Sequence, residues 1–424
     1  MQKFLRKTNT KELMKFLYKL LIFFLILLSP IIIALRIIKK KENPKRFLEK
    51  FAFSSKLKRN GKLVWIHCSS VGELLSIIPL VNFFEISDKI HQILVTSSTL
   101  SSSKLFEKFK FKKTTHQFYP IDNSFIVKKF LNQWQPNLVF FVESEIWPEM
   151  IDEIKKRKIK IFLINARISR KSFKKWNKIK RFASNIFNKF DYIYPQNNET
   201  TKYLRKFNVK NVKMLGNLKF IPTTKPFLSR IPKNFFTNRN LLCIASTHPN
   251  EEKIFIDAHL KLKEKINNIL TIIIPRHIER TREICDLIKK NNFNYINHSS
   301  KKKINKSTDF YIVDTYGESE SFYSLSNVVF LGGSLVQKGG QNPLEPLRFG
   351  CSLLHGKNVD NFKDIYKMLE KKNLSKLVNK NKNIYKTLAL SLKKRKNEKK
   401  IIHEFRRLGK QVLKQNLSEI KKFI

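Results

Sequence analysis

The sequence predicts an α/β protein with two domains, each built around a parallel β-sheet. From about residue 61, short apolar runs alternate with longer amphipathic stretches, which is typical of strands buried on both faces of a parallel sheet. The 424 residues suffice for two domains and one appended segment, and 42% hydrophobic content suffices for their cores. Length and composition therefore exclude a short peptide module and an intrinsically disordered chain.

The amino-terminal segment departs from this pattern. Residues 20–35 carry no charge, and basic residues flank them on both sides. This run is slightly shorter than the roughly 20 residues that a spanning helix needs, although apolar neighbours extend it, and Pro30 would kink the helix. We interpret residues 1–45 as a membrane-anchor helix with basic flanks. A cleavable signal peptide and a buried core helix remain alternatives, and the flanking charges leave the orientation of the anchor open.

Residues 46–222 are predicted to form the first domain, with strands in the apolar runs 64–68, 93–96, 138–142, 161–165 and 192–195. Acidic residues follow two of these runs, at the strand ends where open α/β sheets bind ligands. Glu73 opens the helix after the first run, where a carboxylate either offsets the helix dipole or acts as a base. Glu143 and Glu145 follow the third run, and carboxylates beside apolar neighbours are costly unless partnered. At least one of the pair is therefore expected to face a cleft.

Residues 223–240 are predicted to be a linker, because three of the 14 prolines fall in the aperiodic segment 221–240. Residues 241–424 are predicted to form the second domain, with strands in the runs 241–246, 270–275, 310–314, 328–334 and 352–356. From Leu374 onward the chain is rich in lysine and helical in pattern, without strand signals.

Glycine is concentrated in the second domain, where seven of the 11 glycines lie between Gly317 and Gly356. This crowding predicts backbone with positive φ or in close contact with a neighbour. Asn342 and Pro343 are predicted to be the N-cap and the first residue of a helix, and a helix start fronted by glycines suits a phosphate. The alternative is a capping-box-like pair between Asn342 and Glu345.

The charge is strongly positive, with 85 Lys+Arg against 33 Asp+Glu and a formal net charge of +52. Such a surface attracts nucleic acid, anionic lipid and phosphorylated small molecules alike, and a compositional bias toward lysine would also produce it. The four cysteines and nine histidines show no metal-binding spacing. We therefore expect reduced, buried thiols and no metal site.

Short ordered motifs carry a family resemblance. They are S-V-G-E at 70–73, E-S-E-I-W-P at 143–148, N-A-R at 165–167, G-N-L-K at 216–219, S-T-H at 246–248, P-R-H at 275–277, D-T-Y-G-E at 314–318 and G-G-Q-N-P-L-E at 339–345. With these motifs, nearly the whole chain resembles the 3-deoxy-D-manno-octulosonic acid (Kdo) transferases. That family moves Kdo from CMP-Kdo to the lipid A precursor, lipid IVA, at the cytoplasmic face of the inner membrane of Gram-negative bacteria.

The resemblance implies the GT-B glycosyltransferase architecture, with two Rossmann-like domains. The first would bind the acceptor and the second the CMP-sugar, without a cofactor. It implies that Glu73 is the catalytic base and that Glu143 and Lys219 stabilise the transition state. The residues that it assigns to CMP binding are Pro275, Arg276, Tyr316, Gly317, Glu318, Asn342, Pro343, Leu344 and Glu345.

The chemistry of sugar transfer fits these residue types. A carboxylate such as Glu73 can accept the proton of the attacking hydroxyl, and direct attack inverts the anomeric carbon. An oxocarbenium-like centre and a departing phosphate develop opposite charges, which a carboxylate and cations such as Lys219 and Arg276 can stabilise. Taken alone, each of these two cations would be read as a solvated surface charge. No D-x-D pair accompanies the nucleotide motifs, so we expect no metal.

Two positions depart from the family pattern, and two alternatives stay open. Tyr316 replaces the usual Met and Gln341 the usual His, which bears on nucleotide affinity rather than on transfer chemistry.

A GT-B enzyme that uses a UDP-sugar would share many of these sequence features. A membrane-attached nucleic-acid-binding protein would share the charge, but no recognised module or basic-aromatic platform is present. We therefore expect anionic inner-membrane lipids and the phosphorylated acceptor, rather than nucleic acid, as partners of the basic surface.

Overall fold

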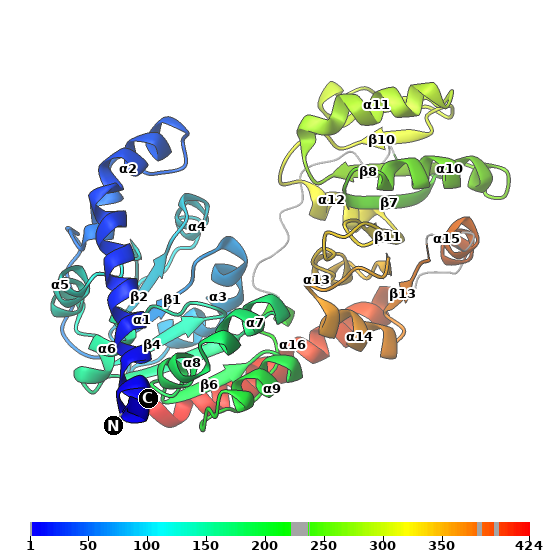
Figure 1. The fold of residues 1–424 in the computed structure, drawn as a ribbon. Coiled ribbons are helices and arrows are strands. Elements are labelled where there is room, and N and C mark those ends of the chain that lie inside the picture. Colours follow the sequence, from blue (N-terminus) through cyan, green and yellow to red (C-terminus); the bar gives the residue numbers. More distant parts are fainter. Residues whose placement is uncertain (1, 222–235, 237, 380–383, 394–397) are drawn as a thin grey trace. The chain divides into compact units, whose positions relative to one another are not determined.

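The computed structural model describes residues 2–424 except 222–235, 237, 380–383 and 394–397. The chain divides into two compact units (Figure 1). Unit 1 comprises Met1–Thr223 and Gly409–Ile424, and unit 2 comprises Thr224–Leu408. Each unit contains one parallel β-sheet, which confirms the predicted α/β class. Most of the predicted linker, residues 223–240, lies outside the described residues.

Unit 1 contains a six-stranded sheet in the order β3-β2-β1-β4-β5-β6. Its strands are β1 (Leu63–His67), β2 (Gln92–Ser97), β3 (Thr114–Phe118), β4 (Leu138–Val142), β5 (Lys160–Ala166) and β6 (Tyr192–Pro195). Every pairing is parallel, and the strand order reverses between β1 and β4. Such a reversal opens a crevice beyond the carboxyl ends of the strands, where open α/β sheets bind ligands. The sequence missed β3, an edge strand whose polar residues give no apolar run.

Helices cover both faces of this sheet. They are α3 (Val71–Glu85), α4 (Leu100–Phe106), α5 (Ser124–Trp134), α6 (Pro148–Lys156), α7 (Arg170–Lys178), α8 (Lys180–Phe187) and α9 (Asn198–Lys206). Alternate residues of β1 enter two separate hydrophobic clusters, with Trp65 packing toward α5 and α6 and Ile66 toward α3. Burial on both faces is the reason why the strand reads as a continuous apolar run.

Unit 2 contains a seven-stranded sheet in the order β13-β12-β11-β7-β8-β10-β9. Its strands are β7 (Asn240–Thr247), β8 (Ile269–Pro275), β9 (Tyr295–Asn297), β10 (Phe310–Ile312), β11 (Val328–Leu331), β12 (Ser352–His355) and β13 (Ser375–Leu377). The order reverses at β7, between β11 and β8. The expectation that no strand follows Leu374 is wrong, because β13 pairs with β12 at the edge of the sheet. A three-residue edge strand containing an exposed lysine leaves no hydrophobic pattern in the sequence.

The helices of unit 2 are α10 (Glu251–Lys263), α11 (Thr281–Lys290), α12 (Ser319–Leu325), α13 (Leu344–Arg348), α14 (Lys363–Lys371) and α15 (Ile384–Lys393). The last helix, α16 (Glu398–Ile420), begins in unit 2 and ends in unit 1. Its final turns pack in the core of unit 1, where Ile420 is buried and Glu419 pairs with Lys213 at 2.6 Å. The expected second domain, residues 241–424, therefore extends too far, because Gly409–Ile424 completes the first unit.

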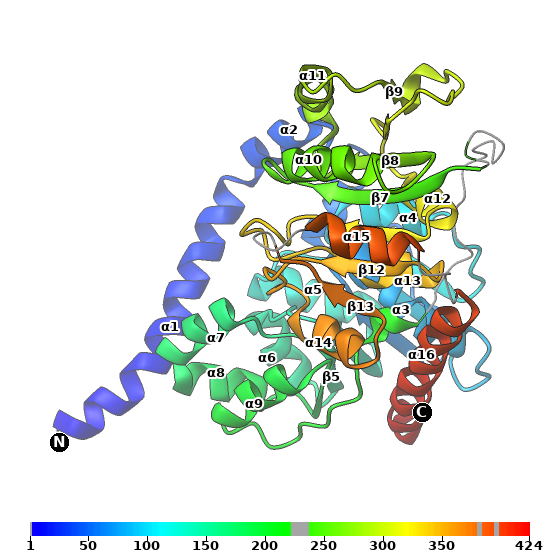
Figure 2. The same cartoon turned by 90° about the vertical axis from the view of Figure 1, so that its right-hand side faces the viewer.

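Two helices form the amino terminus, α1 (Gln2–Leu27) and α2 (Ser29–Ile38). Glu12–Leu27 and Ser29–Ile38 meet at an angle of 55°, and Pro30 in the first turn of α2 accounts for the break as expected. No single helix of the described residues is long and apolar enough to cross a membrane, whereas this bent pair passes the same test jointly. Figure 2 shows α1 as a long rod that continues into α2.

One side of α1 is fixed to unit 1. Lys15 pairs with Asp152 of α6 at 2.5 Å, and the Tyr18 hydroxyl donates to the buried Asp122 at 2.6 Å. Asp122 also accepts hydrogen bonds from two backbone N–H groups at the start of α6. Between residues 13 and 38, most of the remaining surface of the pair is apolar and exposed. Its exposed large side chains are Leu13, Phe16, Leu17, Leu20, Leu21, Phe23, Phe24, Leu25, Leu27, Leu28, Ile31, Ile32, Leu35 and Ile38.

Candidate active site

The three predicted catalytic residues all lie in unit 1, at the carboxyl edge of its sheet. Glu73 lies in the first turn of α3, after β1, and Glu143 directly follows β4. Lys219 belongs to the short helix η2 (Leu218–Phe220). A Cβ atom on Gly72 would lie 4.0 Å from Cε of Lys219, so this lysine lies against the turn that carries Glu73. The sheet order reverses between β1 and β4, so the three side chains gather at its ligand-binding position.

The start of α3 holds the Glu73 carboxylate in place. Its Oε2 accepts a hydrogen bond from Ser69 N at 2.7 Å, and its Oε1 accepts one from the Ser70 hydroxyl at 3.1 Å. Ser70 is the N-cap of α3, and its Oγ accepts from Glu73 N at 3.4 Å. This reciprocal pairing resembles a capping box, so Glu73 also stabilises the helix start. Each carboxylate oxygen keeps a second lone pair that can accept the proton of an acceptor hydroxyl.

Glu143 and Lys219 form a buried ion pair. Oε1 of Glu143 lies 2.5 Å from Nζ of Lys219, and Asn165 Nδ2 donates to the same oxygen at 3.3 Å. Only 6% of Glu143 is exposed, so these partners offset the cost of burying its charge. The Asn165 side chain also accepts a hydrogen bond from Leu218 N at 3.0 Å. Asn165 thus connects the carboxylate to the segment that presents Lys219.

Glu143 and Asn165 occupy unusual backbone conformations. Their φ angles are 59° and 50°, in the left-handed region that residues other than glycine seldom adopt. Glu143 N donates to Ile164 O and Arg167 N donates to Glu143 O, so β4 and β5 hold both turns in place. Such backbone strain persists where the surrounding structure enforces it, and it clusters at functional sites.

Glu145 points to different partners. Its Oε2 lies 3.0 Å from Nε2 of the buried His67 and accepts a hydrogen bond from Trp147 Nε1 at 2.9 Å. Burial opposes ionisation, but these hydrogen bonds hold the pKa of Glu145 below its ordinary value. Glu145 is therefore held by His67 and Trp147, while Glu143 is the one of the pair that contacts a predicted catalytic residue.

Burial and the neighbouring charge of Glu143 raise the pKa of Glu73 to about 7, against the hydrogen bonds from Ser69 and Ser70. A carboxyl group with a pKa near neutrality is a far stronger base than an ordinary glutamate when it is ionised. Perturbed acids beside a specific charge partner are typical of catalytic sites. The electrostatics of unit 1 thus favour Glu73 as a proton acceptor.

The predicted nucleotide residues lie in unit 2, at the carboxyl edge of the second sheet. Pro275 ends β8, and the loop after β10 carries Tyr316, Gly317 and Glu318. The loop after β11 leads to Asn342, Pro343, Leu344 and Glu345. Because β8, β10 and β11 run parallel in one sheet, their ends share an edge.

Arg276 is an exposed cation at this edge. Its backbone N donates to Thr247 O at 3.1 Å, which ties the turn after β8 to the end of β7. No carboxylate pairs with its guanidinium among the described residues. Burial and nearby Glu320 raise the pKa of Glu345, and the charge of Arg276 is close enough to oppose that rise. The structure thus brings Arg276 near the Asn-Pro-Leu-Glu segment.

Glu318 is held by Thr315 of its own motif and by His298, which the sequence did not single out. His298 Nε2 lies 3.1 Å from Glu318 Oε2, and the Thr315 hydroxyl donates to the same oxygen. His298 Nδ1 lies 2.8 Å from the Tyr311 hydroxyl, so the ring bridges Tyr311 and Glu318. Tyr316 is 65% exposed, and its hydroxyl donates to Glu279 at 3.1 Å.

A buried carboxylate organises the glycine-rich loop after β11. Glu251, at the start of α10, accepts hydrogen bonds from the backbone N–H groups of His248, Gly333, Ser334 and Leu335. Gly333 has a φ of 66°, and a Cβ on Gly332 would lie 2.4 Å from Ser246 O. Both conditions predicted from the glycine crowding, positive φ and close approach, therefore occur in this loop.

The helix expected at Asn342 begins later than predicted. α13 runs from Leu344 to Arg348, with Pro343 as its N-cap rather than its first residue. Asn342 Oδ1 still accepts a hydrogen bond from Leu344 N at 3.2 Å, and its Nδ2 donates to Glu345 at 3.2 Å. Asn342 and Glu345 therefore pair as the alternative expected, but through their side chains and not as a capping box, because Pro343 is the N-cap. A five-residue helix carries little dipole, so α13 by itself would contribute little to the binding of a phosphate.

The remaining expectations concern thiols and metals. All four cysteines are free and buried, as expected. Among the described residues, no three His, Cys, Asp or Glu side chains lie in a group that could hold a metal ion.

Comparison with known sequences places the chain in a family. A profile described as "3-Deoxy-D-manno-octulosonic-acid transferase (kdotransferase)" matches residues 45–221. A 3-deoxy-D-manno-octulosonic acid transferase of Rickettsia bellii is 35% identical over 355 residues, covering 83% of this chain and 84% of the relative. The chain belongs to the Kdo transferases. The corresponding transferase of Haemophilus influenzae is 33% identical, with 72% of this chain and 73% of the relative covered.

Solved structures support the architecture of this Kdo transferase. A glycosyltransferase from Rickettsia africae has a TM-score of 0.56 at 12% identity, covering 86% of this chain and 99% of that one. A UDP-GlcNAc 2-epimerase from Neisseria meningitidis has a TM-score of 0.55 at 13% identity, covering 83% and 100%. At these identities the likeness concerns the fold alone, and it confirms the GT-B arrangement of two Rossmann-like domains.

The sequence of this Kdo transferase indicates no role for three further residues of the candidate site. Asn165 lies within a family motif, N-A-R, but nothing in the motif shows that its amide supports Glu143. Glu251 lies three residues after His248 and resembles an ordinary carboxylate of a first helical turn. His298 follows a three-residue edge strand that has no sequence signal. Each acts through a tertiary contact that pattern analysis does not reveal.

Proposed function

We propose that the protein transfers Kdo from CMP-Kdo to a hydroxyl group of the lipid A precursor, lipid IVA, with inversion at the anomeric carbon. Family membership supports the activity. The observation that carries the mechanism is the Glu73 carboxyl group, whose pKa is about 7 and which lies beside the Glu143–Lys219 ion pair. These groups meet at the sheet reversal, where α/β proteins bind ligands.

In the proposed reaction, the acceptor oxygen attacks the anomeric carbon of Kdo while the bond from that carbon to the phosphate oxygen of CMP breaks. Glu73 accepts the proton of the attacking hydroxyl. Glu143 stabilises positive charge that develops on the sugar, and Lys219 stabilises negative charge on the oxygens of the donor. Because both groups are positioned before substrate arrives, little reorganisation is needed during the reaction. Each step uses side chains of this chain, so we propose that no metal takes part.

In the same proposal, unit 2 binds the CMP portion. Arg276 is an exposed cation without a carboxylate partner among the described residues and suits the phosphate. Glu318, held by His298 and Thr315, presents an oriented acceptor that suits a ribose hydroxyl. The loop that Glu251 holds after β11 presents backbone near the end of β7. Pro275, Gly317, Pro343 and Leu344 shape this edge rather than supply charge.

We further propose that the protein is attached to the cytoplasmic face of the inner membrane through α1 and α2. Lys15 and Tyr18 hold one side of α1 against unit 1, while the other side exposes apolar residues. This arrangement suits a helix that lies in the membrane interface with its apolar face in the lipid. The excess of lysine and arginine would strengthen attachment to anionic lipids.

The decisive experiment is incubation with CMP-Kdo and tetra-acylated lipid IVA, followed by mass spectrometry of the lipid. We expect the mass of the acceptor to increase by that of Kdo residues with the wild-type protein and to stay unchanged with Glu73→Gln. Thermal-shift titrations with CMP and UDP test the donor class, because a ligand that binds the native state raises the melting temperature. Stabilisation by UDP but not by CMP would favour the alternative of a UDP-sugar enzyme and contradict the proposal.

A further inference from the structure

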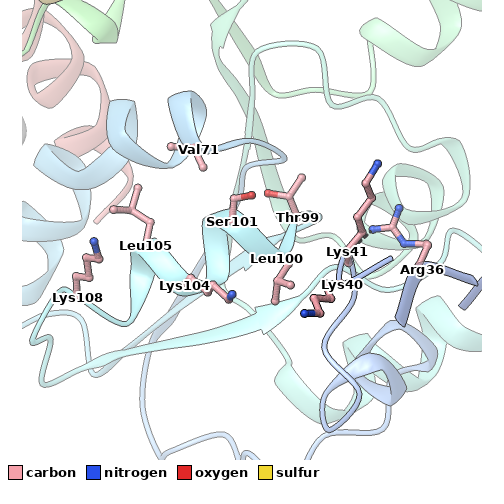
Figure 3. A pocket seen from close by; sticks show the side chains of 10 residues that line it. All are labelled: Arg36, Lys40, Lys41, Val71, Thr99, Leu100, Ser101, Lys104, Leu105 and Lys108. Atoms are coloured by element: carbon pink, nitrogen blue, oxygen red, sulfur yellow. Dashed lines mark hydrogen bonds between the residues drawn. The ribbon is translucent and has the colours of Figure 1, made fainter. Parts of the chain in front are cut away.

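A basic cavity lies in unit 1, between the end of α2 and α4 (Figure 3). Its volume is about 680 Å³. Arg36, Lys40 and Lys41 reach it from the end of α2 and the turn that follows, Lys104 reaches it from α4, and Lys108 reaches it from the turn after α4. These five residues are called the basic cavity residues below. The remaining lining is hydroxyl-bearing or apolar, and it includes no acidic side chain.

The charge of this cavity is largely uncompensated. Arg36 pairs with Glu42 at 3.0 Å, but the four lysines have no carboxylate partner among the described residues. Like charges that face one cavity repel one another, and the repulsion is relieved when an anion binds between them. A phosphate monoester, with nearly two negative charges and several acceptor oxygens, matches such a group of ammonium donors.

The cavity lies between the apolar anchor and the proposed catalytic base. On its α2 side, Lys40 and Lys41 closely follow Ile38, an exposed residue that we propose to be in contact with lipid. Its opposite side includes Val71, the first residue of α3 and two positions before Glu73. Backbone hydrogen bonding continues this connection, because Ser98 N donates to Ser69 O and Ser69 N donates to the Glu73 carboxylate. An anion in the cavity would therefore lie near both the membrane-facing helices and the turn that carries the base.

We propose that this cavity binds a phosphate group of the lipid acceptor and thereby directs an acceptor hydroxyl toward Glu73. The inference rests on the proposed function, since it assigns a subsite to the acceptor of that reaction. A lipid held at its acyl chains by the bilayer still rotates and moves laterally. A fixed phosphate removes much of that freedom and favours reaction at one hydroxyl. A bilayer phospholipid offers the same phosphate chemistry, so the experiment must separate the two sources.

The test uses the full-length double variant Lys104→Ala/Lys108→Ala in neutral-detergent micelles. Alanine at position 104 preserves the helical propensity of α4, and Lys108 is exposed in the turn after the helix, so the two substitutions remove basic cavity residues without disturbing α4. The acceptor is supplied either phosphorylated or after enzymatic removal of its phosphates. We expect the KM for phosphorylated acceptor to rise about tenfold, the loss that follows removal of charge-assisted contacts to one anion. With dephosphorylated acceptor, variant and wild type should agree within about twofold, because the lost contacts have no partner there.

The matched control is Lys410→Ala/Lys414→Ala. Lys410 and Lys414 are exposed on α16 with the same four-residue spacing along the chain, and replacing them removes the same charge from unit 1. They should leave the KM for both acceptors unchanged, and the KM for CMP-Kdo should be unchanged in both double variants. An equal loss with both acceptors, or no loss with either, would overturn the proposal.

Two further arms distinguish the remaining outcomes. Binding to phosphatidylglycerol vesicles without acceptor tests the bilayer as the source of phosphate. If the cavity variant loses only vesicle binding and keeps its preference for phosphorylated acceptor, the cavity binds bulk lipid and the proposal fails. Binding of acceptor to the Glu73→Gln protein tests the cavity without turnover. Phosphate-dependent binding that requires Lys104 and Lys108 would support the cavity even if the wild type transferred no Kdo.

Discussion

Glu73 has a geometry that suits both of the roles that the sequence presents as alternatives, helix stabilisation and the proposed role of a base. Its carboxylate accepts hydrogen bonds from Ser69 and Ser70 at the start of α3, which is the helix-stabilising role. The same contacts fix its orientation, and burial beside Glu143 raises its pKa to about 7. A residue that stabilises a helix start can thus be a well-positioned base, because the hydrogen bonds that orient it leave lone pairs free.

The pH dependence of transfer should report this residue. A base must be unprotonated, so kcat/KM should rise with pH along a limb whose midpoint is near 7. Glu143→Gln removes the neighbouring charge that raises the pKa, and the midpoint should move to lower pH although the maximal rate falls. Measuring kcat/KM from pH 5 to 9 checks both statements. A limb near pH 4.5 in the wild type would show that Glu73 is not the titrating base.

The same pKa predicts a gain in stability on substitution. The folded-state pKa of about 7 exceeds the ordinary value of 4.5, so the native state binds the extra proton between these values. The contribution of Glu73 to the free energy of unfolding is therefore largest below pH 4.5, and it is lost as the pH rises toward 7. Glu73→Gln never ionises, so it should stabilise unit 1 at pH 8 by roughly 1–3 kcal/mol and have little effect at pH 5. Thermal unfolding at both pH values provides the measurement, and an equal effect at both would argue against a buried charge.

At the scale of elements, the loop after β11 shows what the sequence reveals and what it omits. The crowding of glycines predicted unusual backbone there, and Gly332 and Gly333 bear this out. The sequence did not reveal the partner of this loop. Glu251, more than 80 residues earlier, accepts hydrogen bonds from three backbone N–H groups of the loop and from that of His248. A backbone that needs positive φ or close contact is visible in the sequence as glycine. The residue that accepts its hydrogen bonds depends on the tertiary fold and is not visible there.

Glu251→Gln should disturb this loop. The amide nitrogen of glutamine cannot accept a hydrogen bond from the backbone N–H groups that face it. Some of the four buried hydrogen bonds are therefore lost, which lowers the free energy of unfolding by about 2–3 kcal/mol. We expect unit 2 to melt earlier and CMP to bind more weakly, as measured by calorimetry of unfolding and of binding. Glu264→Gln, an identical change at the exposed end of α10, should alter neither. Wild-type CMP affinity in Glu251→Gln would separate the loop from nucleotide binding.

The anchor pair yields a separate expectation. Phe16, Phe24 and Ile31 are exposed in the structure, so replacing them by serine removes no core packing. The triple variant should keep the melting temperature of the wild type and lose most of its binding to vesicles, because about 25 cal/mol is lost for each Å² of apolar surface no longer inserted into lipid. Flotation with liposomes measures this binding. Retained flotation would place the membrane contact elsewhere.

Over the whole molecule, the hydrophobic patterns predicted both sheets, because strands buried on two faces leave short apolar runs separated by helix-length segments. They missed β3, β9 and β13, which are edge strands with polar or very short sequences. The helical pattern of α16 was also clear, but not the unit in which it packs. An amphipathic stripe shows that a helix is covered on one side, and it does not identify the covering partner.

The role of α16 can be tested by ending the chain at Leu408. The lost segment includes Ile420, buried in the cluster around α3, and Glu419, the partner of Lys213. We expect hydrogen exchange to accelerate throughout unit 1 while unit 2 keeps most of its protection, because only unit 1 loses part of its core. Uniform acceleration in both units would indicate that α16 supports them equally.

This arrangement of α16 affects the order of synthesis. Unit 1 is assembled from two stretches of sequence, and everything in unit 2 is translated between them. The amino-terminal sheet can form early on the ribosome, yet one side of its core must wait for residues that are made some 185 positions later. During that interval the nascent protein exposes the apolar surface around α3 that the end of α16 later covers. Early contact with the bilayer, or with a chaperone, would protect it until translation delivers the missing helix.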